Sequence, residues 1–597
     1  MRELRGTTTT LTREQPVCRG NPVAMELGSG GGGGRAGLVN TGYWGVSVEA
    51  GTRYSLSLYL RVPEGAGPSN ATVSLLAGGD EAGGVPLASA SFTGLTLQWQ
   101  RYRAELASSA TDHQARLAVL FDGPGRLAVD SVSLVAAANA EQGQAQGLLN
   151  PWPFRADLLA ALKALQPRFL RFPGGCYVEG DWLRGAFRWK EALGRNEERP
   201  GHHNRHGSSR GMWGYWSTDG LGLFEYLLLA EELGAEPVWV VNNGIAHNDQ
   251  VATRDIWPWE ALDGIEFISG PANSTWGAVR AAMGRPQPWR LNFLAIGNEA
   301  SGAGARGLHA PPAGQHGLPA AAASAAPRHC QWNYLALYSA IKAAHPHLRL
   351  IANCHLGDLG PTEIWEYHVY TNPQDLFARR HAFDGATPAG GLIFASEYAV
   401  TDGGGQGNLI GAVAEAAFMT GMERNSGGGG AVLAGAYAPL MVNANARPWP
   451  TNMLVFDNHR VFGIPSFHVQ QLLSRHLGTQ LVGTEVAGGA EDWLAASATC
   501  QSKMCDEVAV KVVNFSPSQQ LVGLRIRGLA AGSLGATGQL LVLGGQQPLD
   551  ENSFHEPLKV ATRTEAISGV AEQFELALPA WSVSVLKLRI VPPAAKK

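Results

Sequence analysis

The strongest constraint on the fold is a regular alternation of short apolar runs and amphipathic segments between residues 148 and 477. Each run has the length of a buried strand, and six of the seven carry polar or special residues at their ends. Strands that alternate with helices form parallel sheets, so this part predicts a (β/α)8 TIM barrel in which seven strands are evident. The seven runs are 168–175, 236–244, 292–299, 348–354, 364–370, 392–398 and 432–442.

Helices are expected between these strands. In the segment 219–234, Asp219 is the expected N-cap and Gly234 the expected end. Further helices are expected at 157–167, 332–344, 408–424 and 466–476. The low-complexity segment 300–328 is expected to be a disordered insertion in the barrel.

Two all-β parts flank the barrel. Residues 53–62 alternate apolar and polar side chains with a period of two, and similar runs follow. We therefore expect a β-sandwich over 1–147, with a flexible loop tip at 30–34, and a second β-sandwich over 478–597. In the first sandwich Trp44 is expected to pack in the core, with stacking on a sugar as the alternative.

Composition excludes several classes of protein. The net charge of -4 and the pI of 6.5 give no reason to expect a nucleic acid or an anionic membrane as partner. No apolar run is long enough to span a membrane, and the first residues contain no apolar segment of a signal peptide.

The cysteines and histidines give no strong metal signature. The six cysteines contain no CxxC pair, although Cys500 and Cys505 are close enough to close a small loop in an oxidising compartment. His202, His203 and His206 lie in a stretch that is more typical of a solvated loop than of a metal site. The N-x-[ST] triplets at Asn70, Asn273 and Asn514 lean weakly toward secretion.

Polar residues gather where the predicted strands end. A single glutamate at a strand end usually forms a structural salt bridge. Here Glu299 and Glu397 end two strands that lie nearly opposite one another, and in a TIM barrel these ends form the mouth. Glycoside hydrolysis needs such a pair of carboxyl groups, one protonated and one ionised. The neighbouring strand ends contribute Arg171, Asn298, His368 and Tyr370.

An extended set of motifs resembles the plant-type α-L-arabinofuranosidases of glycoside hydrolase family fifty-one. The collinear matches include "PRFLRFPGGCYVEGDWLRGAFRWKEALG", "AIGNE", "YHVYTNP", "FASEYAVT" and "AYAPLMVNAN". The resemblance implies that Glu299 is the general acid/base and Glu397 the nucleophile of a retaining enzyme. It also implies that Asn298 holds the sugar 2-hydroxyl, that Arg171, His368 and Tyr370 shape the pocket, and that no metal or cofactor is needed.

The same resemblance predicts the substrate and the location. It implies release of terminal arabinofuranosyl groups from arabinose-containing cell-wall polysaccharides or glycoprotein glycans, outside the cell or in its wall. The first sandwich is similar to a carbohydrate-binding module. Family members begin with a further strand, so this chain is expected to be truncated. The alternatives are an inactive carbohydrate-binding relative and a β-xylosidase that uses the same site.

Overall fold

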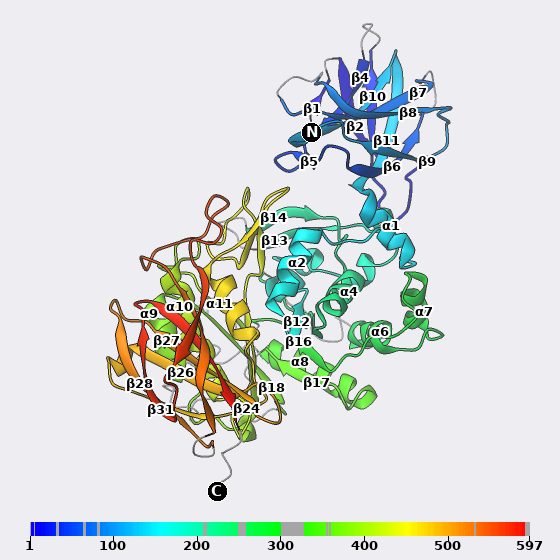
Figure 1. Cartoon of the computed structure of the whole chain (residues 1–597). Helices are drawn as coiled ribbons and strands as arrows, with labels where there is room; N and C mark the ends of the chain where they lie inside the picture. Colours follow the sequence, from blue (N-terminus) through cyan, green and yellow to red (C-terminus); the bar gives the residue numbers. More distant parts are fainter. Residues whose placement is uncertain are drawn as a thin grey trace.

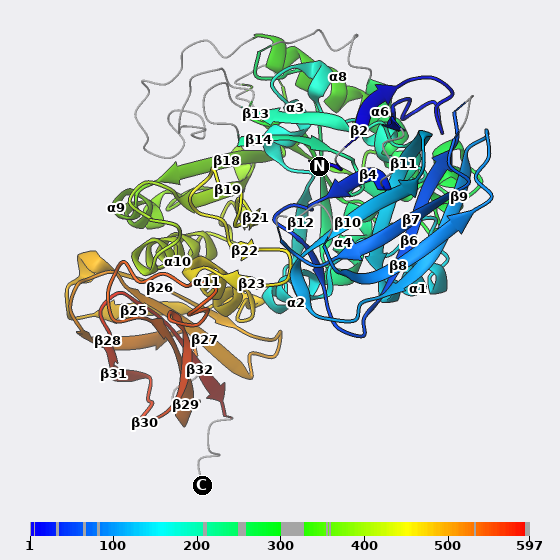
Figure 2. The same ribbon diagram turned by 90° about the horizontal axis from the view of Figure 1, so that it is seen from above.

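The computed structural model describes three parts, a barrel and two β-sandwiches on different sides of it (Figure 1, Figure 2). The described residues are 2–4, 6–30, 35–63, 67–79, 84–206, 212–248, 258–299, 328–353, 356, 360–529 and 533–591. The predicted loop tip, apart from its first residue, and residues 300–327 of the predicted insertion lie outside them. Among the described helices, none is long and apolar enough to cross a membrane.

The seven predicted strands are confirmed, and they form one parallel sheet that curves into a nearly closed barrel. Its order is β12 (Phe169–Phe172), β15 (Glu236–Val241), β16 (Phe293–Ile296), β17 (Arg349–Ala352), β18 (Ile364–Thr371), β19 (Leu392–Val400) and β20 (Val432–Tyr437). Every neighbouring pair is parallel, so all seven carboxyl ends meet at the same mouth.

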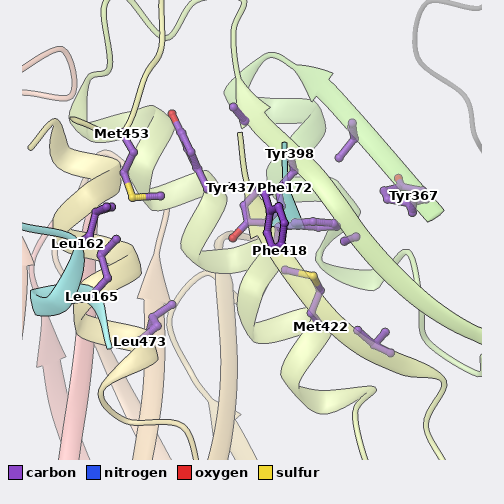
Figure 3. Close-up of a cluster of buried hydrophobic side chains, with 14 of the residues drawn as sticks. Leu162, Leu165, Phe172, Tyr367, Tyr398, Phe418, Met422, Tyr437, Met453 and Leu473 are labelled. Atoms are coloured by element: carbon purple, nitrogen blue, oxygen red, sulfur yellow. The ribbon is translucent and has the colours of Figure 1, made fainter. Parts of the chain in front are cut away.

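Alternation along the strands sorts side chains into two layers. On β15, Val238 and Val240 belong to a small cluster inside the barrel, whereas Trp239 and Val241 belong to the large core beneath the helices. Figure 3 shows part of this large core, where the ring of Tyr398 lies 5.3 Å from that of Phe418 in an edge-on contact. The packing of both layers fixes the strand ends that carry the polar residues.

Most predicted helices are confirmed with small shifts of their ends. Asn408 caps α10 by accepting a hydrogen bond from the backbone N–H of Gly411, and Gly234 ends α4 in the left-handed conformation, with a φ of 61°. The longer helices of the barrel part are α2 (Ala156–Leu165), α4 (Leu223–Leu233), α6 (Pro258–Ser269), α7 (Thr275–Ala282), α8 (Arg328–Ala344), α10 (Leu409–Arg424) and α11 (Pro465–Ser474).

Two predictions in this region are wrong. Asp219 does not cap a helix, and His202 does not lie in a solvated loop. The helix α4 begins four residues later, after Gly222, whose N–H donates to Glu225. Asp219 is buried and instead contacts His202 Nδ1 at 2.9 Å. His202 begins the strand β13 (His202–His206), which pairs with β14 (Met212–Ser217). A buried histidine thus binds the carboxylate that the sequence pattern assigned to a helix end.

Both flanking parts are β-sandwiches, as predicted. The first consists of one sheet with β1 (Arg2–Glu3), β4 (Arg35–Asn40), β5 (Val46–Val48), β7 (Asn70–Leu76), β8 (Pro86–Thr93) and β10 (Asp112–Asp122), and a second with β2 (Thr7–Thr12), β3 (Ala24–Ser29), β6 (Arg53–Arg61), β9 (Gln100–Ala107) and β11 (Gly125–Ala136). The C-terminal sandwich spans β24 (Gln480–Leu481) to β32 (Ser582–Ile590).

Details of the sandwiches confirm one expectation and overturn others. Cys500 and Cys505 form a disulfide, as their spacing allowed. Trp44 does not pack in the core, because its side chain is 56% exposed in a turn before β5. Asn514 is buried, and its amide donates to the carbonyls of Leu578 and Pro579, so the folded chain does not present it for glycosylation.

Glu415 on α10 makes the stability of the barrel depend on pH. Burial raises its pKa to about 7, and hydrogen bonds from Ser466 and the backbone of Val400 offset only part of this effect. An acid whose pKa is higher in the folded state than its ordinary 4.5 is stabilised in its neutral form. Stability should therefore be full below pH 4.5 and fall as the pH rises through about 7.

Glu415→Gln should remove this loss, because glutamine stays neutral. We expect a gain of up to ~3 kcal/mol at pH 8 and little change at pH 4.5, measured by denaturant unfolding at both values. The exposed Glu191 provides the control, since Glu191→Gln should leave the pH dependence unchanged. An unaltered pH dependence in Glu415→Gln would contradict the assignment.

Candidate active site

All six residues predicted from the strand ends converge at the mouth of the barrel. Arg171 comes from β12, and Asn298 and Glu299 directly follow β16. His368 and Tyr370 come from β18, and Glu397 from β19. The parallel order of the strands therefore assembles a site from residues that lie up to 226 positions apart in the chain.

Arg171 lies at the centre of this site and is almost completely buried. Its Nη1 donates to Glu397 Oε1 at 2.8 Å, and its Nη2 donates to Glu366 Oε1 at 2.7 Å and to Asn298 Oδ1 at 2.9 Å. Burial alone would lower the pKa of Arg171, but the charges of Glu366 and Glu397 outweigh it and raise the pKa. The guanidinium is thus a permanent cation beneath both carboxylates.

The inner face of β18 supplies three consecutive polar groups. Glu366, His368 and Tyr370 alternate along the strand, so all three point toward Arg171 and Glu397. Tyr370 Oη donates to Glu397 Oε2 at 2.6 Å. Together with Arg171, this bond gives each oxygen of the Glu397 carboxylate its own donor.

An irregularity in the pairing of β18 and β19 brings two adjacent residues into the site. Glu366 pairs with Phe394, but His368 pairs with Glu397, so β19 has one extra residue at this point. As a result, Ser396 Oγ reaches both His368 Nε2 and Glu366 Oε1 at 2.8 Å, while Glu397 reaches Arg171. A regular strand would have sent one of these neighbours to the opposite face.

His368 connects the two carboxyl groups predicted to carry the chemistry. Its Nδ1 lies 2.7 Å from Glu299 Oε1 and 3.6 Å from Glu397 Oε2, and its Nε2 lies 3.0 Å from Glu366 Oε1. Burial alone would lower the pKa of His368, but the charges of Glu397 and Glu366 and the hydrogen bonds raise it to about 10. At neutral pH the imidazole is therefore an imidazolium that donates from both nitrogens.

The two glutamates are close together but have different surroundings. One carboxylate oxygen of each lies within 4.8 Å of the other. Glu397 is buried between its two donors, whereas the side chain of Glu299 is one-third exposed to the cavity. The separation is near the ~5–5.5 Å of retaining glycosidases and below the ~6.5 Å at which inverting pairs begin.

Two glycines allow this close packing. A Cβ at Gly175 would lie 2.5 Å from both Asn298 Oδ1 and Glu397 Oε1. Gly297 has a φ of 79°, and a Cβ there would collide with the side chains of Asn243 and Asn353. Larger residues at either position would displace the groups that carry the site.

Sequence reasoning missed three members of the buried network, Glu366, Ser396 and Glu179. The period of two along 364–370 would have pointed to Glu366, since it lies on the same face as His368 and Tyr370. Ser396 needed the irregular register, which no local pattern predicts. Glu179 follows the first strand on the short helix α3 (Gly175–Glu179), and its Oε2 accepts from Asn298 Nδ2 at 3.2 Å.

Cys176, Glu179 and His247 form a second cluster whose ligand-type atoms lie within 4.8 Å of one another. A thiol, a carboxyl and an imidazole are groups that bind zinc. Burial and nearby carboxylates raise the pKa of Cys176 and of Glu179 well above their ordinary values. These shifts favour the protonated forms, which are poor metal ligands. The predicted absence of a metal stays a prediction.

A cavity of about 2950 Å³ opens above the site. Arg171, Glu299, His368, Tyr370 and Glu397 line it, while Asn298 is fully buried behind them. The cavity also continues between β12 and β20, the two outer strands of the sheet in the described part of the chain. The predicted contact of Asn298 with a sugar hydroxyl thus stays a prediction.

Glu366→Gln tests how the network holds the charge of His368. Removal of one neighbouring negative charge should lower the pKa of His368 from about 10. Nitrogen NMR of the histidine-labelled chain should show both ring nitrogens protonated at pH 8 in the unmodified chain, and deprotonation at a lower pH in the variant.

The same substitution should change stability at high pH. A histidine whose pKa is raised stabilises the fold below its ordinary value of 6.5 and loses that effect as the pH rises through about 10. Glu366→Gln should flatten this decline, whereas Glu363→Gln, which removes a charge paired with Lys342, should preserve it. An unchanged titration of His368 would show that Glu366 does not set its charge.

Comparison with known proteins identifies the family to which the chain belongs. Residues 161–388 match the model "Alpha-L-arabinofuranosidase 1 domain", and residues 395–582 match "Alpha-L-arabinofuranosidase C-terminal domain". The chain is 37% identical to alpha-L-arabinofuranosidase 1 of Arabidopsis thaliana, over 93% of this chain and 76% of that protein. It is 31% identical to the extracellular exo-alpha-L-arabinofuranosidase of Streptomyces chartreusis, over 77% of this chain and 52% of that protein.

A solved structure extends the likeness to the fold of almost the whole chain. The arabinose-bound MgGH51 α-L-arabinofuranosidase superimposes with a TM-score of 0.83 and 27% identity, over 99% of this chain and 91% of that one. The sequence matches, the three-part fold and the paired glutamates all indicate the same family. The chain belongs to the plant-type α-L-arabinofuranosidases of glycoside hydrolase family 51.

Proposed function

We propose that this chain is a retaining, exo-acting α-L-arabinofuranosidase that works by double displacement. The observation that carries the proposal is the pair Glu299 and Glu397, with carboxylate oxygens within 4.8 Å of each other and unequal surroundings. Glu397 lies between Arg171 and Tyr370, which stabilise an anion. Glu299 faces the cavity and is the group that exchanges a proton.

The charges around the pair support this division of roles. Arg171 and His368 are cations, and they balance the anions Glu366 and Glu397. Burial, with the neighbouring carboxylates, raises the pKa of Glu179 and favours its neutral form. With Glu299 protonated, the charges of these groups sum to zero.

In the first step the Glu397 carboxylate attacks the anomeric carbon while Glu299 protonates the departing oxygen. The bond from carbon to the leaving group breaks as the bond to Glu397 forms, and the leaving group departs as an alcohol. Glu299 becomes an anion beside the His368 imidazolium, 2.7 Å away. This neighbour stabilises the charge that develops on Glu299.

In the second step Glu299 takes a proton from a water molecule, which attacks the anomeric carbon. The bond to Glu397 breaks, and arabinose leaves with its original configuration because two inversions have occurred. Arg171 and Tyr370 receive the restored Glu397 carboxylate in its original hydrogen bonds. The site returns to its starting charge without a metal ion.

The substrate class and the location are inferred from the named relatives. The Arabidopsis and Streptomyces proteins are named as arabinofuranosidases, and the latter as extracellular and exo-acting. We infer terminal α-L-arabinofuranosyl groups of polysaccharides or glycoprotein glycans as substrates, and an extracellular site of action. An inactive relative is not favoured, because both glutamates and all their charged partners are in place.

Hydrolysis of an aryl α-L-arabinofuranoside tests the roles of the two glutamates. Glu397→Ala should lower kcat by on the order of 10⁵-fold or more, since no nucleophile remains. Azide should restore turnover and yield the β-configured glycosyl azide, because only one inversion then occurs. Nuclear magnetic resonance of the product distinguishes the two anomers.

Glu299→Ala should give the opposite azide product. With a good leaving group the first step needs no acid, so azide should intercept the bound sugar and yield the α-configured azide. With a poor leaving group the loss should be about 10²–10⁴-fold. Glu191→Ala, at an exposed position, is the control. The same anomer from both variants, or faster cleavage of an aryl β-xyloside by the unmodified chain, would contradict the proposal.

A further inference from the structure

Exposed aromatic side chains from two domains surround the entrance to the cavity. Tyr215 and Trp216 come from β14 of the barrel part, and Tyr43 comes from the N-terminal sandwich. All three line the same cavity as Glu299 and Glu397, and they are 57%, 60% and 51% exposed. Exposed apolar side chains that gather at one opening mark a binding surface more often than a solvated one.

Tyr43 lies in a five-residue turn, residues 41–45, which we call the aromatic turn. Its second aromatic residue, Trp44, is 56% exposed, and its ring lies 4.6 Å from that of Tyr43 in an edge-on contact. Trp44 has a φ of 59°, a left-handed conformation that is strained for a residue other than glycine. Core packing explains neither the exposure nor the strained backbone.

The aromatic turn is fixed to the barrel through its backbone. Asn458 Nδ2 donates to the carbonyl oxygens of Trp44 and Gly45 at 3.2 Å and to that of His113 at 2.6 Å. The rings of His113 and His459 stack across the same boundary, with centroids 3.7 Å apart. The backbone that carries the two aromatic side chains is thus held in place before a ligand arrives, which reduces the entropy lost on binding.

A second contact holds the sandwich at a different point. Arg101 Nη1 forms an ion pair with Glu197 at 3.0 Å, and Tyr59 Oη donates to the same oxygen at 3.4 Å. Two separate attachments restrict rotation of the sandwich about either one. The aromatic turn therefore keeps its place at the edge of the cavity.

We propose that the aromatic turn binds the polysaccharide chain from which the terminal arabinosyl group is removed. The flat apolar faces of Tyr43 and Trp44 match the C–H faces of sugar rings. The turn, with the sequence TGYWG, carries no charged side chain, which fits a neutral glycan. The arabinosyl group enters the cavity toward Glu299, and the backbone of the polysaccharide lies across Trp216 and the aromatic turn.

This assignment rests on the proposed function and extends it to the N-terminal domain. The sandwich would act as part of the substrate site and not as a separately tethered module. The selectivity for a polymer over a small arabinoside would then depend on the turn. An aryl arabinofuranoside would fill only the part of the cavity near the glutamates. It therefore serves as the reference substrate with which the polysaccharide is compared.

The test is a double substitution, Tyr43→Ala with Trp44→Asn, in the full chain. Asparagine is chosen because it tolerates the left-handed backbone at position 44. We expect kcat/KM for an arabinosylated polysaccharide to fall about tenfold more than for the aryl arabinofuranoside, mainly through KM. Trp332→Ala is the matched control, since Trp332 is equally exposed at 56% but does not line the cavity. Unchanged thermal unfolding would exclude loss of the fold.

Equal losses on both substrates, or no loss on the polysaccharide, would overturn the proposal. A selective loss on arabinosylated glycopeptides alone would overturn the assignment to a polysaccharide. If the unmodified chain does not cleave the aryl substrate, the proposed function fails. Whether the aromatic turn binds polysaccharide is then tested by a binding measurement alone. Retardation of Glu397→Gln in a polysaccharide-containing gel should then disappear with the double substitution, and its persistence would overturn the proposal.

Discussion

The buried guanidinium of Arg171 holds the active site together. It comes from β12 and bonds to Glu397 on β19, to Glu366 on β18 and to Asn298 after β16, so it connects four strand ends. A buried cation of this kind is stable only when anions and acceptors surround it closely. Removal of Arg171 would leave Glu366 and Glu397 without the cation that they share. The position of Arg171 thus determines where the carboxyl group of Glu397, the proposed nucleophile, lies.

The charges of the residues around Arg171 depend on its positive charge. Glu366 accepts from Arg171 and contacts His368, whose raised pKa keeps it cationic beside Glu299. Burial and neighbouring carboxylates raise the pKa of Glu179, which favours the neutral form of this partner of Asn298. Two anions therefore balance two cations in this network. Glu299 lies beside them, so four carboxyl groups surround the pocket.

Sequence patterns predicted the parts of this arrangement that depend on local periodicity. Apolar runs gave the seven strands, and the rule that parallel strands end at one mouth gathered Arg171, Glu299, His368 and Glu397. Residues fixed by distant partners escaped these patterns. Ser396 joins the site through an irregular register between β18 and β19, and Asp219 pairs with His202 instead of capping a helix. Trp44 is exposed because a turn with a left-handed backbone interrupts the sandwich where burial was expected.

Covalent trapping of the sugar on the enzyme tests the central claim most directly. An activated 2-fluoro arabinofuranoside should form the glycosyl-enzyme quickly and hydrolyse it slowly, because fluorine destabilises both transition states while the good leaving group favours the first step. Mass spectrometry of the intact chain and of its peptides should then find one fluoropentosyl group, attached to Glu397. A label on another residue, or an unlabelled enzyme that releases sugar of inverted configuration, would contradict the account.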